Sequence, residues 1–265
     1  MFGFCPLASG SKGNCLYVGS RKTCVLIDAG ISAALAVERM RELGVNPHSI
    51  QAILITHEHL DHIKGLMVLA EQLKVPVLAN SETAKGIVAA LGERPKFKIF
   101  TTGETFEFGD LVVHPFSIPH DTLDPVAFTI QIESVKLGIC ADIGHITSLV
   151  RKHLEGCDYL YIEANHEPAM VHASSRPKSL KQRILCKQGH LSNGDCAELL
   201  TSIYHPGLKH VHLAHLSGEC NAEEVALRIV REALMGKMVE VSIAYQDKIS
   251  KPIYFKKDGQ ECEGR

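Results

Sequence analysis

The 265-residue sequence contains no tryptophan, and aromatic residues make up only 6% of it. A hydrophobic core must therefore be built mainly from Leu, Ile, Val and Ala. The sequence also lacks any run of the roughly 18 apolar residues that a membrane-spanning helix needs. Residues 1–14 carry neither the basic region nor the apolar region of a secretory signal peptide. These absences lead us to expect a soluble, cytoplasmic protein with no membrane partner.

The nine cysteines include no C-x-x-C pair, and their number is odd. This pattern favours reduced, buried thiols over a disulfide framework. The net charge is only −2 at pH 7, so a nucleic-acid partner would require a local basic patch. Histidine is the one residue type in excess, with 15 copies. This excess hints at metal binding, because imidazole is the commonest metal ligand.

Hydrophobic patterns predict strands and helices that alternate at both ends of the chain, with short strands in the middle. Strands are expected at 23–28, 51–55, 97–100, 105–108, 111–118, 126–133, 136–141, 158–163, 209–214 and 239–244, and helices at 33–43, 63–73, 195–204 and 222–235. We therefore predict one domain over residues 1–255, of the α+β class, with two sheets and helices on both outer faces. A polar tail is expected over residues 256–265.

Residues 56–62 read Thr-His-Glu-His-Leu-Asp-His and follow a predicted strand. His57 and His59 are alternate residues that point the same way, so they can bind one ion together. Asp61 and His62 lie at the turn into the next helix and can reach a second ion. Imidazole and carboxylate ligands without thiolate suit Zn²⁺, Mn²⁺ or Fe and argue against a closed structural zinc site. The alternative is a solvated polar loop, which rarely concentrates histidine in this way.

One loop cannot fill two coordination shells, so other ligands must come from elsewhere in the chain. His120, Asp142 and His215 each follow a strand-like run. Taken alone, a histidine at the end of a strand is more often a surface or core residue than a ligand. Their common placement, together with the H-x-H-x-D-H loop, favours a shared metal site.

This order of ligands resembles the metallo-β-lactamase superfamily, and the likeness extends over about residues 4–245. The strings SGSKGN (9–14), LIDAG (26–30), EANHE (163–167), GHLSN (189–193) and AHLSGECN (214–221) resemble most closely the YycJ/WalJ-type branch, a group of bacterial exonuclease-like hydrolases. The resemblance implies a four-layer αββα sandwich with two divalent metal ions at one edge. These ions would be Zn²⁺ or Mn²⁺, with Fe as a further option.

The resemblance also implies a role for each ligand. One ion would be bound by His57, His59 and His120, the other by Asp61, His62 and His215, and Asp142 would bridge the two. Asp61 is expected to contribute to catalysis as well. Asp28 matches an acid that orients metal ligands in this family, and such partners fix the geometry of the imidazoles.

The GHLSN string resembles a glycine-histidine-serine motif of tRNA 3′-processing nucleases. That likeness implies that His190 protonates the leaving oxygen or binds the scissile phosphate. Those nucleases carry an acid shortly before the bridging Asp, whereas residues 138–141 here contain none. An acid that orients His190 must therefore come from elsewhere. The alternative is that His190 caps the helix expected near Ser192.

Several polar residues are candidates for substrate contacts. The loop at residues 9–14 is either a phosphate cradle or a plain β-turn, and the residues proposed to contact substrate are Ser11, Lys12, Asn14, Asn165, Ser192 and Asn193. The acid-free segment 176–187 carries Arg176, Lys178, Lys181, Arg183 and Lys187. It suits a polyanion such as DNA or RNA, or it is a solvated helix face.

We therefore expect a two-metal nuclease or phosphodiesterase, in its sharpest form a 5′→3′ exonuclease acting on DNA. One alternative is a small-molecule hydrolase for thioesters, lactones or nucleotides, and another is a regulator without catalytic activity. The interval between Asp142 and His215 is too short for the extra domain of β-CASP nucleases. The sequence also contains no Gly/Pro-rich arm of the kind that tRNA-processing enzymes use.

Overall fold

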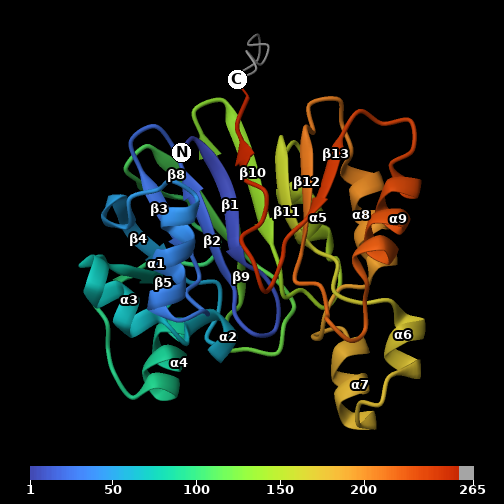
Figure 1. The fold of residues 1–265 in the computed structure, drawn as a ribbon, viewed down its shortest axis with the longest axis horizontal. Coiled ribbons are helices and arrows are strands. Elements are labelled where there is room, and N and C mark those ends of the chain that lie inside the picture. The colour runs from blue at the N-terminus through green and yellow to red at the C-terminus, as the bar shows by residue number, and fades with distance from the viewer. Residues whose placement is uncertain (257–265) are drawn as a thin grey trace.

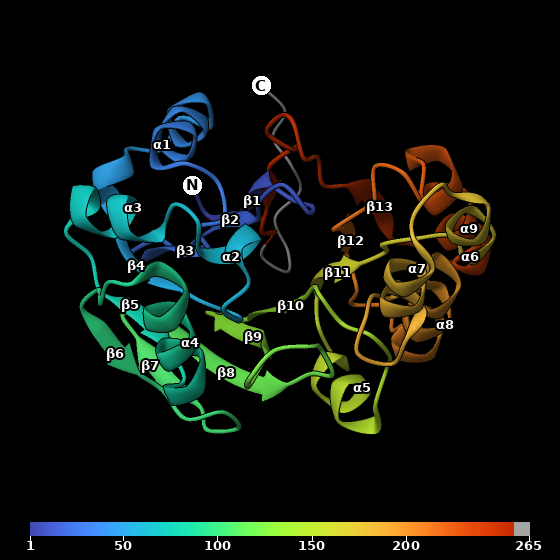
Figure 2. The same cartoon turned by 90° about the horizontal axis from the view of Figure 1, so that it is seen from below.

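The computed structural model describes residues 1–256 and shows two seven-stranded sheets packed face to face, with helices on both outer faces (Figures 1 and 2). The predicted four-layer αββα sandwich is confirmed. The predicted polar tail falls almost wholly on residues 257–265, outside the described residues.

The first sheet has the strand order β14-β1-β2-β3-β4-β5-β6. Its strands are β1 (Gly3–Ala8), β2 (Cys15–Gly19), β3 (Cys24–Ile27), β4 (Ile50–Leu54), β5 (Val77–Ala79), β6 (Phe97–Ile99) and β14 (Ile253–Tyr254). The accompanying helices are α1 (Ala33–Glu42), the 3-10 turn η1 (Pro47–Ser49), α2 (Leu60–Ile63), α3 (Leu66–Leu73) and α4 (Ser81–Leu91). Strands β3 to β6 run parallel to one another.

The second sheet has the order β13-β12-β11-β10-β9-β8-β7. Its strands are β7 (Phe106–Phe108), β8 (Leu111–Ser117), β9 (Val126–Ile132), β10 (Val135–Cys140), β11 (Tyr159–Glu163), β12 (His210–Ala214) and β13 (Glu240–Ile243). Its helices are α5 (Ser148–Leu154), α6 (Pro168–Ala173), α7 (Lys178–Leu185), α8 (Asn193–Ile203) and α9 (Glu223–Ala233). Strands β10 to β13 are parallel, and β8 pairs antiparallel with β9.

Alternation along the strands divides the apolar side chains between layers. In β3, Val25 and Ile27 belong to the core between the two sheets, whereas Leu26 packs under the helices of the first sheet. Successive strand residues point to opposite faces, so a strand buried on both sides is a continuous apolar run. The core that both sheets share supports the proposal that residues 1–255 form one domain.

The predicted helix over 63–73 corresponds to α3, and a division separates it from the short helix α2 that precedes it. The division falls at Gly65, whose N–H donates to the carbonyl of Ala29 at 2.8 Å. A Cβ atom at this position would lie only 1.9 Å from the Ile31 carbonyl oxygen, so only glycine fits. The close approach fixes α2 against the strand end that carries Asp28.

The topology gathers the ends of several strands at one edge of the sandwich. The carboxyl ends of parallel strands meet at one edge of a sheet, and sites commonly form there. This edge, beside α2 in Figure 1, carries the loops after β3, β4, β8, β10, β11 and β12. None of the helices within residues 1–256 combines the length and apolar character needed to cross a membrane.

Candidate metal centre

Asp28 begins the site from the end of β3. It is buried, and its carboxylate accepts hydrogen bonds from the Thr56 amide at 2.9 Å and from the Thr56 hydroxyl. His62 Nδ1 donates to Asp28 Oδ2 at 2.8 Å. The carboxylate therefore fixes both the orientation of the His62 ring and the nitrogen that carries its proton, which leaves Nε2 directed into the site.

A first group of three histidines combines the loop after β4 with the loop after β8. The rings of His57, His59 and His120 each offer a nitrogen, and these atoms lie within 4.8 Å of one another. His57 Nδ1 donates to the Thr56 hydroxyl at 3.0 Å, and His120 Nδ1 donates to the Gly189 carbonyl at 3.2 Å. Burial holds the pKa of His57 well below its ordinary value, so this imidazole is neutral and able to bind a metal.

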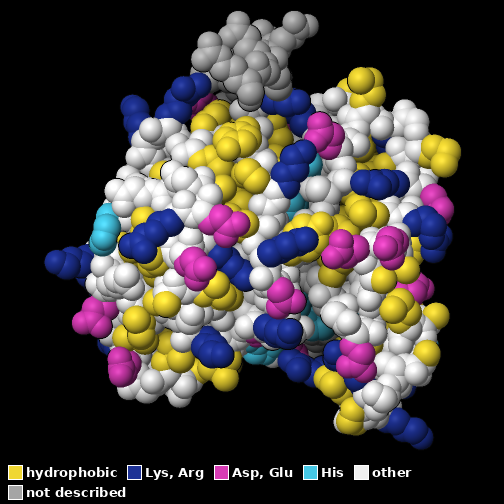
Figure 3. Space-filling model, viewed as in Figure 1, with side chains coloured by type: hydrophobic (Ala, Val, Ile, Leu, Met, Phe, Trp, Pro, Cys, Tyr) yellow, Lys and Arg dark blue, Asp and Glu magenta, His cyan; other side chains and the backbone are white. Residues whose placement is uncertain are grey.

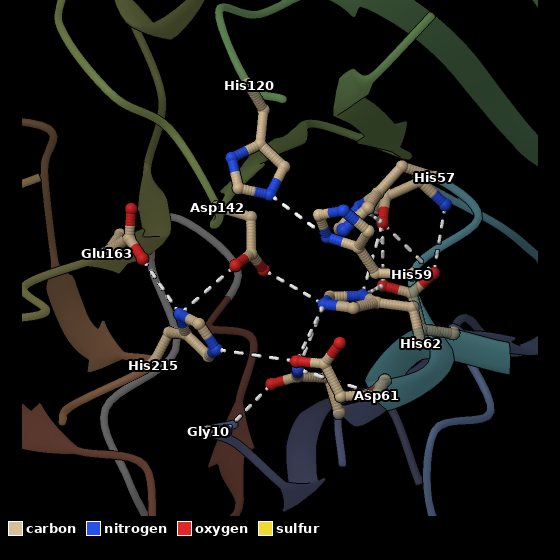
Figure 4. Close-up of polar contacts among 12 residues, drawn as sticks. Gly10, His57, His59, Asp61, His62, His120, Asp142, Glu163 and His215 are labelled. Atoms are coloured by element: carbon tan, nitrogen blue, oxygen red, sulfur yellow. Dashed lines mark hydrogen bonds and ion pairs between the residues drawn. The ribbon is translucent and has the colours of Figure 1, made fainter. Parts of the chain in front are cut away.

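A second group forms around Asp142, directly after β10 (Figure 4). His62 Nε2 lies 3.0 Å from Asp142 Oδ2, and His215 Nδ1 lies 3.2 Å from Asp142 Oδ1. Asp61 Oδ2 is 3.9 Å from the Nε2 atoms of both His62 and His215. His57 also lies within reach of His62 and Asp142, so Asp142 joins the first group to the second.

Two buried nitrogens in this cluster have no hydrogen-bond partner within residues 1–256. They are Nε2 of His57 and Nε2 of His215. A buried polar atom left without a partner costs roughly 1–3 kcal/mol, so such atoms at a His/Asp cluster call for a bound cation. The nitrogen and oxygen donors present fit divalent metal ions. The cluster is thus able to bind metal ions.

Sequence reasoning missed Glu163, the last residue of β11. It is fully buried, and Oε1 accepts hydrogen bonds from His190 Nδ1 at 2.9 Å and from His215 Nδ1 at 2.8 Å. Oε2 accepts from the backbone N–H groups of Ile143 and Leu191 at 2.8 and 3.1 Å. This residue supplies the acid that residues 138–141 lack, and it orients His190 and His215 together.

The carboxylates and imidazoles stabilise each other's charges. Burial would raise the pKa of Glu163, but His190 and His215 outweigh it and hold that pKa at about 2. Burial would lower the pKa of His215, yet Asp142 and Glu163 raise it to about 9. Despite its burial, Asp142 has a pKa well below the ordinary range, because His215 and His62 are close to it. Both carboxylates are therefore anionic at neutral pH.

Three of the predicted site residues share an uncommon backbone conformation. Asp28, Asp142 and His215 have φ values of 63°, 54° and 54°. Asp28 and His215 are the first residues after their strands, and Asp142 is the second residue after β10. Left-handed conformations are uncommon for residues other than glycine and concentrate at functional sites. Here they turn each side chain from its strand into the shared centre.

The loop at residues 9–14 uses its backbone N–H groups within the protein. Gly10 donates to Asn14 Oδ1 at 2.8 Å, Lys12 donates to Gln246 Oε1 at 2.7 Å, and Gly13 donates to the Gly10 carbonyl at 2.9 Å. Asn14 donates to the Asp61 carbonyl at 2.7 Å. These bonds favour the β-turn interpretation and show that the loop supports Asp61. The phosphate contacts of Ser11, Lys12 and Asn14 stay a prediction.

The other candidate contacts differ in their positions. Asn165 lies on the wall of the site cavity and donates to the His215 carbonyl at 2.7 Å. Ser192, rather than His190, is the N-cap of α8, and its hydroxyl accepts from the Asp195 amide. Asn193 is fully buried and hydrogen-bonds Asn221. Neither Ser192 nor Asn193 lines the site cavity, and their contact with substrate stays a prediction.

The metal cluster opens into a cavity of about 460 Å³. His59, Asp61, Asp142, His190 and His215 line one side of it, and Arg176 and Arg183 line another. Ser11 also lies on its wall, whereas the Lys12 side chain is exposed near Asp247. Figure 3 shows histidine and Lys/Arg side chains together at the hollow on this edge of the molecule.

Comparison with known proteins gives a consistent result. Residues 8–188 match the metallo-beta-lactamase superfamily model. The chain is 36% identical over 246 residues to exodeoxyribonuclease YycJ of Bacillus anthracis, which covers 92% of this chain and 93% of that protein. It is 35% identical over 229 residues to exodeoxyribonuclease WalJ of Streptococcus pneumoniae serotype 2 (strain D39), covering 85% of each.

Among solved structures, the metallo-beta-lactamase fold protein YhfI of Bacillus subtilis superposes with a TM-score of 0.70 at 15% identity, covering 93% of this chain and 98% of that one. At this identity the match bears on the fold alone. The family model matches most of the chain, the two relatives align with most of its length, and the His/Asp cluster lies where the strands of both sheets end. All three observations indicate the same family. The chain belongs to the metallo-beta-lactamase superfamily.

Proposed function

We propose that this protein is a two-metal phosphodiesterase that hydrolyses DNA as an exonuclease. The observation that carries the proposal is one cavity that reaches both groups of candidate metal ligands, at His59 and at Asp142 and His215, and is also lined by His190, which Glu163 orients. The two relatives named exodeoxyribonucleases, which extend over most of this chain, support DNA as the substrate and an end of the strand as the point of attack.

The proposed metal ligands are divided between two ions. His57, His59 and His120 would hold one ion, Asp61, His62 and His215 would hold the other, and Asp142 would contact both. Two divalent ions, which we propose to be Zn²⁺ or Mn²⁺, would neutralise the scissile phosphate and supply hydroxide at neutral pH. In support of this division, His57, His59 and His120 form one group of candidate ligands, and Asp142 belongs both to the group that contains His62 and to the group that contains His215.

His190 is the proposed general acid. Its Nδ1 atom donates to Glu163, so Nε2 is the nitrogen left to face the cavity that the ring lines. A proton on Nε2 can pass to the leaving oxygen of the sugar, whose departure is difficult without protonation. The buried Glu163 carboxylate accepts the hydrogen bond from His190 Nδ1 and prevents the ring from turning.

The first test combines metal content with hydrolysis of linear DNA labelled at its 5′ or its 3′ end. Wild type should hold two metals and release labelled nucleotides from one end, whereas His59→Ala and Asp142→Ala should lose metal and activity together. His48→Ala is the matched control, because His48 is exposed and remote from the cluster. A wild type that binds two metals but leaves all DNA intact would exclude the nuclease and favour hydrolysis of thioesters, lactones or nucleotides.

We also propose the cytoplasm as the place of action. The eight cysteines among residues 1–256 are all free thiols, and most of them are buried. Free thiols persist in reducing compartments, whereas secreted proteins commonly pair them.

A further inference from the structure

The segment of residues 168–189 carries α6 and α7, which lie side by side at one edge of the sandwich (Figure 1). Its residues Arg176, Leu180, Arg183 and Ile184 line the cavity at the metal cluster. A small apolar cluster of Val171, Ile184 and Cys220, with Leu180 against it, anchors the segment to the loop after β12. The Gly189 carbonyl accepts the hydrogen bond from His120 Nδ1. The segment therefore contacts the loop after β12 through its apolar side chains and contacts His120 through the backbone at its end.

Only two of the five basic residues in this segment line the cavity. Arg176 and Arg183 lie on its wall, together with the apolar side chains of Leu180 and Ile184. Lys178 is exposed and is not part of that wall. Arg176 lies in the loop before α7 and Arg183 lies on α7, so a solvated helix face does not explain why both line the cavity.

Each of the two guanidinium groups is held by a carboxylate. Arg183 makes two hydrogen bonds to Asp121, at 2.5 Å from Nε to Oδ2 and 3.2 Å from Nη2 to Oδ1. Asp121 Oδ1 in turn lies 3.5 Å from His120 Nε2, so one carboxylate separates Arg183 from the first histidine group. Arg176 Nε donates to Glu219 Oε2 at 3.1 Å.

These ion pairs are easily exchanged. One member of each pair is about half exposed, Arg183 at 52% and Glu219 at 47%, whereas Asp121 and Arg176 are 29% and 26% exposed. Ion pairs at the protein surface contribute only about 0–1 kcal/mol. A phosphodiester is tetrahedral, but its two non-bridging oxygens can accept two hydrogen bonds from a guanidinium, as a carboxylate does, and it is also anionic. The arginines are thus oriented before substrate arrives, yet little free energy is lost when they change partner.

We propose that Arg176 and Arg183 bind the phosphates that flank the scissile one, so that the preferred substrate is a polynucleotide strand rather than an isolated phosphodiester. This inference rests on the proposed function, in which the metal cluster holds the scissile phosphate. The arginines line the same cavity as His59, Asp61 and Asp142, so they are available to phosphates next to the one held at the cluster. Specificity for a polymer then comes from this segment and not from the metal ligands.

The test is the binding of end-labelled DNA to the full chain in EDTA, followed by fluorescence anisotropy between 50 and 200 mM salt. Arg176→Gln and Arg183→Gln should each weaken binding by about five- to tenfold and should each reduce the slope of log K against log salt by about one. Lys178→Gln, the matched control from the same segment, should change affinity by less than about twofold. Glu219→Gln should strengthen binding, because it releases Arg176 without removing it.

The outcomes separate this inference from the proposed function. If Arg176→Gln and Arg183→Gln bind DNA as wild type does, or if Glu219→Gln weakens binding, the arginines only brace the segment and the inference is overturned. The inference also fails if wild type does not bind DNA at all. If DNA binding depends on the arginines but no metal restores hydrolysis, the arginines are confirmed as phosphate contacts and the nuclease proposal is wrong.

Discussion

Glu163 Oε1 accepts a hydrogen bond from His190 Nδ1 at 2.9 Å, although the two residues are 27 positions apart. The same oxygen accepts from His215 Nδ1. One buried carboxylate therefore orients both a proposed metal ligand and the proposed general acid. The metal cluster and the proton donor are coupled through this residue, and a change at Glu163 should affect both.

The first prediction concerns that shared carboxylate. Glu163→Gln removes the negative charge and replaces one oxygen by an NH2 group, which must face the N–H groups either of His190 and His215 or of Ile143 and Leu191. The two imidazoles then lose a charged common anchor. Changes to residues that orient metal ligands typically cost about 10–100-fold in metal affinity or activity. We expect weaker metal retention on dialysis as well as a slower rate, measured by metal analysis and DNA hydrolysis. Full retention of both would show that Glu163 has no orienting role.

A second prediction separates proton donation from metal binding. His190→Ala should keep its metal content but lose about 10²–10⁴-fold in DNA hydrolysis. Bis-p-nitrophenyl phosphate should be affected much less, because p-nitrophenolate leaves without protonation. The ratio of the two rates in wild type and variant is the measurement. An equal loss on both substrates would argue that His190 positions the phosphate instead of donating a proton.

The sequence predicts a site residue when a pattern in the neighbouring residues identifies it, and misses one whose role depends on the pairing of distant strands. Asp28, His57, Asp142 and His215 all stand at or just beyond the ends of apolar strand patterns, and the structure brings them together at one edge. Glu163 also ends a predicted strand. Its importance depends on register, because it pairs with Ala214, the residue before His215. Register between distant strands is not encoded in any local pattern.

Helix α7 shows a second limit of sequence reasoning. Its eight residues are mostly polar, and Ile184 is its only buried residue. A helix this short is marginal in water without packing. The sequence therefore predicts it only as a basic stretch, and its position against the cavity arises from contacts with Val171 and Cys220. The sequence likewise does not predict β5 and α4, because neither has a long periodic pattern.

A third prediction concerns metal removal. Because the two sheets pack on an extensive apolar core, the protein should stay folded in EDTA, as judged by far-UV circular dichroism. Its melting temperature should rise when Mn²⁺ or Zn²⁺ is added, since binding to the folded state alone stabilises it. His57→Ala should reduce that rise, because it removes a buried ring nitrogen that has no hydrogen-bond partner. An equal rise in His57→Ala would place the stabilising metal elsewhere.

The last prediction concerns stability in acid and involves His212 on β12, away from the metal cluster. The ring stacks on Tyr161, its Nδ1 atom lies 2.8 Å from the Ser242 hydroxyl, and burial lowers its pKa to about 3. In the unfolded chain the pKa of histidine is about 6.5. Below that pH the unfolded state takes up a proton that the folded state refuses, so the free energy of unfolding falls as the pH decreases.

This single group accounts for a loss of up to about 1.4 kcal/mol per pH unit between pH 6 and pH 4. His212→Asn retains an acceptor for Ser242 but does not titrate, so its unfolding free energy should decline less steeply by about that amount. Urea unfolding in EDTA at pH 7, 6 and 5 gives the slope, with His48→Asn as the exposed control. Parallel curves for wild type and His212→Asn would mean that the buried ring is not a source of acid sensitivity.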